Sequence, residues 1–233
     1  ELAAWIDVFT RRHGSDNPPY TNTNAGRGQS AYPLLKFLGR NVLAANVIES
    51  AGETALATQV RDETRKAIEL YFQQTPAHPP GLENPGEGQA PPYFYYDPEV
   101  GCLNQYPASL GASIIFPADT NDPPWDEFGS ISRCNDHHFH YGYMINAAAQ
   151  IAIADPTWGA NWKDAINQLV FDVANDPAVN PNPIFEFPKT RNWDPWMNHG
   201  MASGFSFADN IGNNEESNSE HINFWAGVIL WAG

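Results

Sequence analysis

A long apolar run with a strongly polar beginning constrains the fold of this chain more than any other feature. Residues 144–153 read MINAAAQIAI, which predicts an apolar helix. The stretch just before it, 135–143, reads NDHHFHYGY and combines an acid, an amide, imidazoles and phenols. Burying so many hydrogen-bonding groups costs free energy unless each finds a partner. We therefore expect a functional site at the start of a helix over about 137–154.

The rest of the chain also has a mainly helical pattern, because apolar residues recur at helical spacing in four further segments. Helices are predicted over 31–50, 53–73, 159–174 and from 215 onward. A strand is predicted at 93–97, and loops at 14–30, 75–92, 97–135 and 176–212. Residues 1–10 fit a short helix or an extended piece. No βαβ rhythm and no fixed-period repeat is visible. Antiparallel helix pairs with long loops and little strand predict a mainly α fold, as in an α-solenoid or an (α/α) toroid.

Composition limits the partners. The net charge of −15 and a pI near 4.6 disfavour nucleic acid and anionic membranes, whereas a neutral substrate meets no electrostatic conflict. No apolar window approaches the ~18 residues of a membrane-spanning helix. Many Asn, Pro, Gly and Trp residues with few Lys favour an extracellular, secreted protein. The chain starts at Glu1 without Met and stops inside an apolar run, so we expect a piece of a longer protein.

Two pairs of polar residues have the spacing of a shared helical face. Asp136 and His140 are four positions apart, as are Glu216 and Glu220. Two helix edges could thus offer carboxylates and an imidazole to one cleft. Cleavage of a glycosidic bond needs such a set, because one carboxylic acid protonates the leaving oxygen and a carboxylate activates water or attacks the sugar. A helix N-terminus favours an ionised Asp136, so Glu216 and Glu220 would have to oppose that effect.

Simpler interpretations exist for each of these residues. Asp136 alone could be a helix N-cap, and Glu216 an exposed first-turn residue. The cluster of His137, His138 and His140 could ligate zinc, although zinc ligands usually lie at i and i+4 or on separate elements. Several aromatic residues could be core or could stack on sugar rings, and we expect at least two to stack. These are Tyr95, Tyr96, Trp193, Trp196 and Phe205.

The motif at 135–143 resembles the signature of glycoside hydrolase family 81, the endo-β-1,3-glucanases. Four more segments follow in the order of that family. Residues 93–97 match its YFYYD, 106–112 resemble its YPASFGA, 199–204 its HSWASG, and 213–220 its NQESSSE. The resemblance covers roughly residues 30–233.

The resemblance implies a function and roles for several residues. It places the general acid on Asp136, the general base on Glu216, and two further residues important for activity on His140 and Glu220. It implies inverting, endo-acting hydrolysis of β-1,3-glucan by a monomer without a cofactor or metal. It also implies that 1–233 is the helical catalytic domain, a double ring of helices that is incomplete here and lacks the upstream β-sandwich of full-length members.

Other residues are expected to bind the glucan. They are Tyr95, Tyr96, His137, His138, Tyr143, Trp193, Trp196, His199 and Asn213. The chain also departs from the family motifs. Gly200 and Met201 replace Ser-Trp, so a cleft aromatic is expected to be missing, and Glu215 replaces Gln and could share the role of the base. An insertion before Asn135 carries Cys134, which could pair with Cys102.

Two other functions stay open at this point. The departures at Gly200, Met201 and Glu215 would fit a glucan-binding helical domain without catalysis, although the four matched polar residues argue against it. The histidine cluster would fit a zinc-dependent hydrolase, which a chelator would inactivate.

Overall fold

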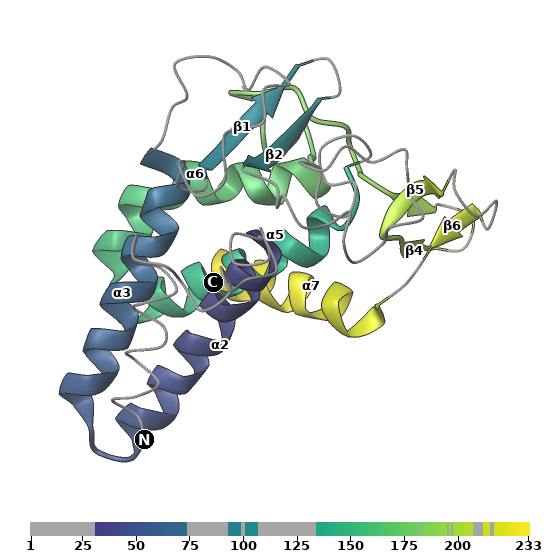
Figure 1. Ribbon diagram of the computed structural model, residues 1–233. Helices are drawn as coiled ribbons and strands as arrows, with labels where there is room; N and C mark the ends of the chain where they lie inside the picture. The colour runs from purple at the N-terminus through teal and green to yellow at the C-terminus, as the bar shows by residue number, and fades with distance from the viewer. Residues whose placement is uncertain are drawn as a thin grey trace, which may run out of the picture.

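The protein is mainly helical, as predicted. The computed structural model describes residues 31–73, 93–98, 101–106, 134–181, 183–194, 196, 198–206, 212–214 and 217–233. Its helices are α2 (Ala31–Ser50), α3 (Thr54–Gln73), α5 (His137–Ala154), α6 (Pro156–Val173) and α7 (Asn218–Ala232). Three small antiparallel two-stranded sheets complete the described part (Figure 1). The expectations for residues 1–30, 75–92 and 107–133 lie outside the described residues.

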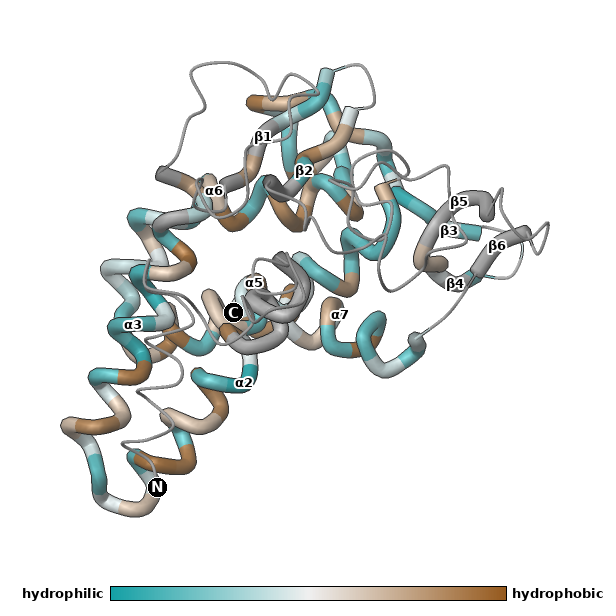
Figure 2. Tube along the Cα trace, viewed as in Figure 1, coloured by the Kyte–Doolittle hydropathy of each residue, from teal (hydrophilic) through white to brown (hydrophobic). Residues whose placement is uncertain are grey.

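Helices α2 and α3 form an antiparallel hairpin, and their predicted bounds are confirmed within a residue. Gly52 closes the turn between them with φ of 91°, in the left-handed region that glycine enters without steric cost. The apolar stripe of α3 is visible as hydrophobic segments recurring along the helix in Figure 2. A small core of Ala45, Ile48, Ala57 and Val60 joins the two helices near the turn.

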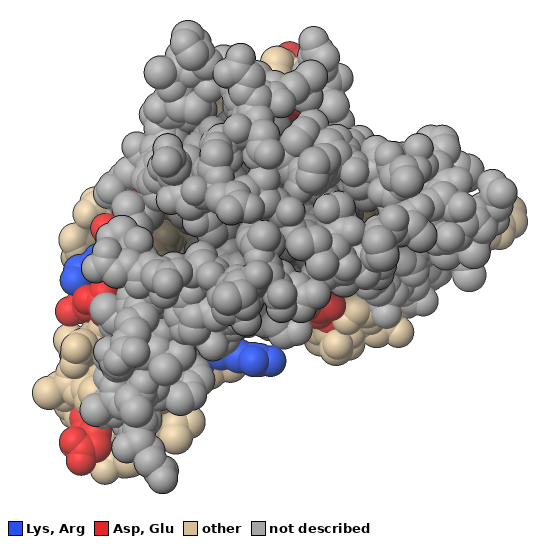
Figure 3. Space-filling view, in the orientation of Figure 1, with Lys and Arg blue, Asp and Glu red and all other residues tan. Residues whose placement is uncertain are grey.

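Charged residues lie on the outer face of this hairpin. Figure 3 shows Lys, Arg, Asp and Glu side chains mainly over α2 and α3 on the face in view. Arg65 pairs with Asp62 at 3.1 Å, and Lys66 pairs with Glu63 at 2.8 Å. Exposed pairs of this kind contribute little to stability because water screens them, so this run mainly provides a solvated surface.

Helix α5 lies at the centre and packs against α2, α6 and α7 (Figure 1). Its predicted bounds of 137–154 are confirmed. Alanines at 147, 148 and 149 are fully or almost fully buried, which lets the neighbouring helices approach closely. The core around α5 includes Leu38, Ile68, Tyr141, Ile145, Leu169 and Phe224. Among the described helices, none is both long and apolar enough to cross a membrane.

Two helix starts differ from the prediction for a local reason. Helix α6 begins at Pro156 rather than at 159, because proline is tolerated at the first helical position, where its missing N–H is not needed. The Asp155 carboxylate caps this helix by accepting from the Trp158 N–H at 3.1 Å. Helix α7 begins at Asn218 rather than at 215, because Ser217 is its N-cap and accepts from the Glu220 N–H.

The strand at 93–97 is confirmed as β1 (Tyr93–Asp97), but it has a partner that the sequence prediction missed. Residues within the predicted loop 97–135 form β2 (Cys102–Tyr106), antiparallel to β1. Gly101 leads into β2 with φ of 68° and donates its N–H to the Asp97 carbonyl at 2.8 Å. The segment predicted as loop over 176–212 also contains short strands. These are β3 (Trp193–Asp194), β4 (His199–Gly200), β5 (Ser203–Ser206) and, at its end, β6 (Gly212–Asn214).

Candidate active site

The site is organised by the close crossing of α5 and α7. A Cβ atom on Gly142 would lie 2.8 Å from the Cα of Phe224, and one on Gly227 would lie 3.0 Å from the backbone nitrogen of Asn146. Glycine on both helices therefore allows their backbones to touch. Because segments about 80 residues apart in the chain meet here, the contact fixes how the start of α7 lies relative to α5.

The two helices begin at the same end of the crossing. Tyr143 on α5 reaches Glu220 in the first turn of α7. Later positions of α7 then meet α5, with Phe224 beside Gly142 and Gly227 beside Asn146. Both helices therefore run in the same general direction, as Figure 1 shows. The polar start of α5 and the polar start of α7, predicted from sequence as the two sides of one site, are brought together.

Asp136 occupies the N-cap position of α5 without acting as a cap. Its side chain makes no capping hydrogen bond. Its N–H donates to the Ala202 carbonyl at 2.8 Å, and its carbonyl accepts from the His140 N–H at 2.8 Å. The residue is 6% exposed. The interpretation of Asp136 as an ordinary capping residue is therefore wrong, since the backbone is fixed on both sides while the carboxyl does not close the helix.

The backbone at the start of α5 is strained. Cys134, Asp136 and Asn192 have φ of 50°, 58° and 50°, in the left-handed region that non-glycine residues rarely enter. The Asn192 side-chain amide donates to the carbonyls of Cys134 and Ala202, both at 3.0 Å. Met201 donates its N–H to the Asn192 carbonyl at 2.7 Å. Such residues cost about 1–3 kcal/mol each and cluster at functional sites, where surrounding contacts hold them.

Glu220 is joined directly to α5. Its Oε1 accepts a hydrogen bond from the Tyr143 hydroxyl at 2.6 Å. A hydrogen bond to a charged acceptor contributes more than a neutral one and also fixes the direction of the carboxylate. Glu220, which was expected to tune catalysis, and Tyr143, which was expected to bind glucan, are thus directly hydrogen-bonded to each other.

His137 belongs to a buried network rather than to an open surface. It is fully buried, and its Nδ1 lies 2.6 Å from Oδ2 of Asp172 on α6, which is also fully buried. The other carboxylate oxygen accepts from the Leu103 N–H at 2.7 Å and from Arg191 at 3.0 Å. Arg191 in turn donates to the Gly101 carbonyl at 2.6 Å. This arrangement favours a structural role for His137 over the predicted contact with glucan.

The charge state of this network follows from its neighbours. Burial alone lowers the pKa of His137, but the negative charge and the hydrogen bond of Asp172 outweigh burial, so the net direction of the pKa is upward. His137 and Arg191 therefore flank one carboxyl group, and that group favours the charged form of the imidazole. Removing one member would leave a buried charge without compensation.

His138 and His140 differ from His137 because, among the described residues, burial and neighbouring imidazoles govern their pKa values. Burial lowers the pKa of His138 to about 3, and the nearby His221 and His137 add to the effect. Burial also holds the pKa of His140 well below its usual range. Both imidazoles are therefore neutral at ordinary pH. The roles predicted for them, orientation by His140 and glucan contact by His138, stay predictions.

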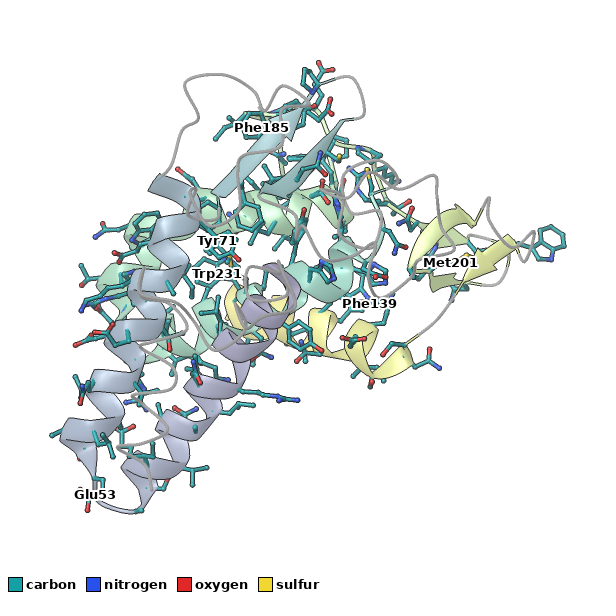
Figure 4. The ribbon with its side chains drawn as sticks, in the orientation of Figure 1. Glu53, Tyr71, Phe139, Phe185, Met201 and Trp231 are labelled. Carbon is teal, nitrogen blue, oxygen red and sulfur yellow. The ribbon has the colours of Figure 1, made fainter. Side chains whose placement is uncertain are left out.

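The departure at Gly200 and Met201 has a structural explanation. A Cβ atom on Gly200 would lie 2.2 Å from Cε1 of His221, so no other residue fits without moving that ring. The ring is held by Trp225, whose Nε1 donates to Nε2 of His221 at 2.8 Å. Met201, labelled in Figure 4 beside β4, is only 2% exposed. The expectation of a missing cleft aromatic thus concerns a position that is buried in this chain.

The predicted sugar-stacking aromatics lie in different surroundings. Tyr96 stacks on Phe185 with ring centroids 4.4 Å apart and donates its hydroxyl to the Glu186 carbonyl, so it is engaged within the protein. Trp193 is half-buried on β3, whereas Trp196 is 94% exposed and offers a free ring face. The side chains of Tyr95, His199, Phe205 and Asn213, and all of Glu215 and Glu216, lie outside the described residues.

Comparison with known proteins identifies the family. Residues 110–233 match the C-terminal domain of glycosyl hydrolase family 81. A glucan endo-1,3-beta-D-glucosidase of Acetivibrio thermocellus is 36% identical over 203 residues, which cover 86% of this chain and 22% of that protein. This chain belongs to glycoside hydrolase family 81.

Two further relatives of this family 81 chain agree. A glucan endo-1,3-beta-D-glucosidase of Thermobifida fusca is 33% identical over 98% of the chain and 25% of its own length. The solved structure of a family 81 glycoside hydrolase variant from Clostridium thermocellum superimposes with a TM-score of 0.67 and 32% identity, over 100% of this chain and 27% of that one. The chain therefore spans about a quarter of the length of these relatives.

Several residues around the candidate site could not be predicted from the sequence. Asp172, Arg191, Asn192 and His221 hold the start of α5 but belong to none of the motifs considered. Only Asp172 gave a signal, because a single acid stands beside Leu169 and Val173 on the apolar face of α6. In the described part of the chain, no group of three or more His, Cys, Asp or Glu side chains is arranged to hold a metal ion.

Proposed function

We propose that this chain carries the acid/base centre of an inverting endo-β-1,3-glucanase. The observation that supports it most is the state of Asp136, which is held in a strained backbone at the start of α5 while its carboxyl leaves the helix uncapped. In this proposal Asp136 is the general acid, which donates its proton to the glycosidic oxygen as the bond to the sugar carbon breaks.

The general base in this proposal is Glu216. It directly precedes Ser217, the N-cap of α7, and the α5–α7 crossing brings that end of α7 toward the start of α5. Glu216 takes a proton from a water that attacks the anomeric carbon from the opposite face. An inverting enzyme needs its two carboxyl groups ~6.5–9.5 Å apart to leave room for this water.

Glu220 and Tyr143 support the reaction as a pair. Their 2.6 Å hydrogen bond fixes the Glu220 carboxylate in the first turn of α7, where it orients water or a sugar hydroxyl. His140, a neutral imidazole one helical turn after Asp136, orients the acid in this proposal. Trp196, with its exposed ring, is a candidate to stack on a glucose unit.

The wider setting in this proposal comes from the family likeness. The chain is the helical catalytic part of a secreted, monomeric glucanase, and its helices form part of an (α/α) toroid. The linear β-1,3-glucan is a neutral polymer, which suits a chain with a net charge of −15.

The test is hydrolysis of a linear β-1,3-glucan by the full-length protein and its Asp136→Asn variant, with and without EDTA. We expect activity that survives EDTA and falls about 10²- to 10⁴-fold in the variant, because general acid catalysis typically contributes about that factor. NMR of the first product should show the inverted α-anomer.

A matched control is Asp155→Asn. Asp155 is also a helix N-cap aspartate, but it caps α6 through its side chain, and asparagine preserves such a cap. This variant should keep wild-type activity. Activity lost to EDTA would instead indicate the zinc hydrolase, and glucan binding without cleavage by the wild type would indicate the binding domain.

A further inference from the structure

The two cysteines of the chain lie beside each other at the start of α5. Cys102 opens β2 and is fully buried, while Cys134 precedes Asp136 by two residues and is 5% exposed. Both are free thiols. Cys102 donates to Oδ1 of Asn104 at 3.4 Å, and the two thiols are close enough for each to shift the pKa of the other. The chain has only these two cysteines, so neither has another intramolecular partner within it.

Two neighbouring side chains also hold the two cysteine segments in place. Arg191 donates to the carbonyl of Gly101, the residue before Cys102, at 2.6 Å. The next residue, Asn192, donates to the carbonyl of Cys134 at 3.0 Å. Two consecutive side chains thus clamp the two cysteine segments, so the thiols meet because the fold places them there.

We propose that Cys102 and Cys134 are a disulfide site that links β2 to the strained residue just before the start of α5. The oxidant is a disulfide of the glutathione type or that of a thiol oxidase. The Cys134 thiolate attacks one sulfur of that disulfide, forming a mixed disulfide and releasing one thiol. The Cys102 thiol then loses its proton and attacks the Cys134 sulfur, releasing the second thiol. Two thiols of the chain are oxidised and one external disulfide is reduced.

The local charges suit this order of attack. The hydrogen bond from Cys102, aided by the nearby His137 and Arg191, lowers the pKa of the Cys134 thiol to about 7. The same contact raises the pKa of Cys102. Once these neighbours are in place, Cys134 is the more readily ionised of the two thiols, which favours it as the first to attack.

Burial determines when the bond forms. Because almost no thiol surface is exposed in the folded chain, oxidation takes place during folding, before the segments close over the sulfur atoms. Once formed, the disulfide is shielded from reductants by the same burial. It would tether Cys134, whose φ of 50° lies in the left-handed region, and thereby hold Asp136. This last consequence rests on the proposed function, whereas the disulfide itself does not.

The decisive experiment is peptide mapping of the full-length protein, refolded in glutathione buffers from fully reduced to fully oxidised and alkylated with iodoacetamide in denaturant. Arg133 directly precedes Cys134, so trypsin separates the cysteines onto peptides 67–133 and 134–163. We expect a linked pair of these peptides that comes apart on reduction. Both cysteines alkylated at every buffer ratio, or a disulfide to another chain, would overturn the proposal.

Thermal melting provides a second readout. A disulfide that closes a loop of roughly 30 residues should raise the melting temperature by about 5–10 °C over the reduced form. Cys102→Ser and Cys134→Ser should each abolish the response to reductant, and an unchanged response in either variant would contradict the assignment. Peptide mapping of the wild-type protein tests the disulfide even if a variant fails to fold. It also tests the disulfide if the protein hydrolyses no glucan.

Discussion

The α5–α7 crossing leads to a prediction with a built-in control. In Gly142→Ala, the added Cβ would lie 2.8 Å from Cα and 2.9 Å from Cβ of Phe224. Ordinary van der Waals contact begins at 3.4 Å, so α7 must move by about 0.6 Å at this point. Gly39→Ala is the control, because it also replaces a buried helical glycine but meets only Tyr143, at 3.5 Å.

The difference between the variants isolates the clash. Both gain about 0.5–1 kcal/mol of helix propensity on going from glycine to alanine. Only Gly142→Ala also incurs overpacking against backbone, which costs about 1–3 kcal/mol. Gly39→Ala should therefore be slightly more stable than wild type. Gly142→Ala should have a free energy of unfolding about 1–3 kcal/mol below that of Gly39→Ala.

The assay is urea unfolding of the full-length proteins, combined with kcat/KM on linear β-1,3-glucan. Because the shift occurs beside the Tyr143–Glu220 contact, Gly142→Ala should lose about 10-fold or more in kcat/KM, and Gly39→Ala less than 2-fold. Equal stability of the two variants would refute the idea that glycine holds the helices in contact. Normal activity in a destabilised Gly142→Ala would refute the link from the crossing to the site.

Three further predictions concern single groups. Tyr143→Phe removes the hydrogen bond to Glu220 and should lower kcat/KM about 10- to 100-fold in initial-rate assays, and a change under 2-fold would exclude a role for this bond. Asp172→Asn should cost about 3–5 kcal/mol in urea unfolding, because it leaves the partners in a buried ion network uncompensated, whereas a cost under about 1 kcal/mol would contradict that network. The depressed pKa of His138, about 3, means that its stabilisation is present above about pH 6.5 and is lost as the pH falls toward 3. Between pH 7 and 5, wild type should therefore lose about 2 kcal/mol more than His138→Asn, and parallel losses would show that His138 does not titrate as expected. The raised pKa of His137 gives stability a pH dependence of the opposite sign, but His137 is present in both proteins, so its contribution cancels in the comparison.

Helix positions could be predicted from the sequence where apolar spacing and a terminator agree. The bounds of α2, α3 and α5 are confirmed because Gly52 and the Asp155-Pro156 pair interrupt continuous apolar stripes. The predicted start of helix α6, at 159, was three residues too late because Pro156 was interpreted only as a helix terminator, although the same residue also starts a helix. Strand β2 was missed because its pairing with β1 depends on a turn rather than on alternating hydrophobicity.

In the candidate site too, local spacing predicted some features, while contacts between distant segments determined others. Local spacing was enough to group Asp136 with His140, and the Tyr143–Glu220 bond joins two residues that the motifs had indicated. Spacing could not separate His137 from His138, which are neighbours with opposite pKa shifts. What separates them is Asp172, which approaches from another helix, and contacts of that range are not encoded in any short motif.

The Asp172 network also has a consequence for how such a chain can change during evolution. It fixes the start of α5 from the side of α6 and β2, through His137, Leu103 and Arg191, all of which are buried or nearly so. The groups proposed to act on substrate lie on other side chains of the same turn and on α7. Mutations that alter substrate preference can therefore accumulate on one side of α5 without loosening its anchor on the other. Adaptation to a new substrate and retention of the fold are to that extent separate problems for this protein.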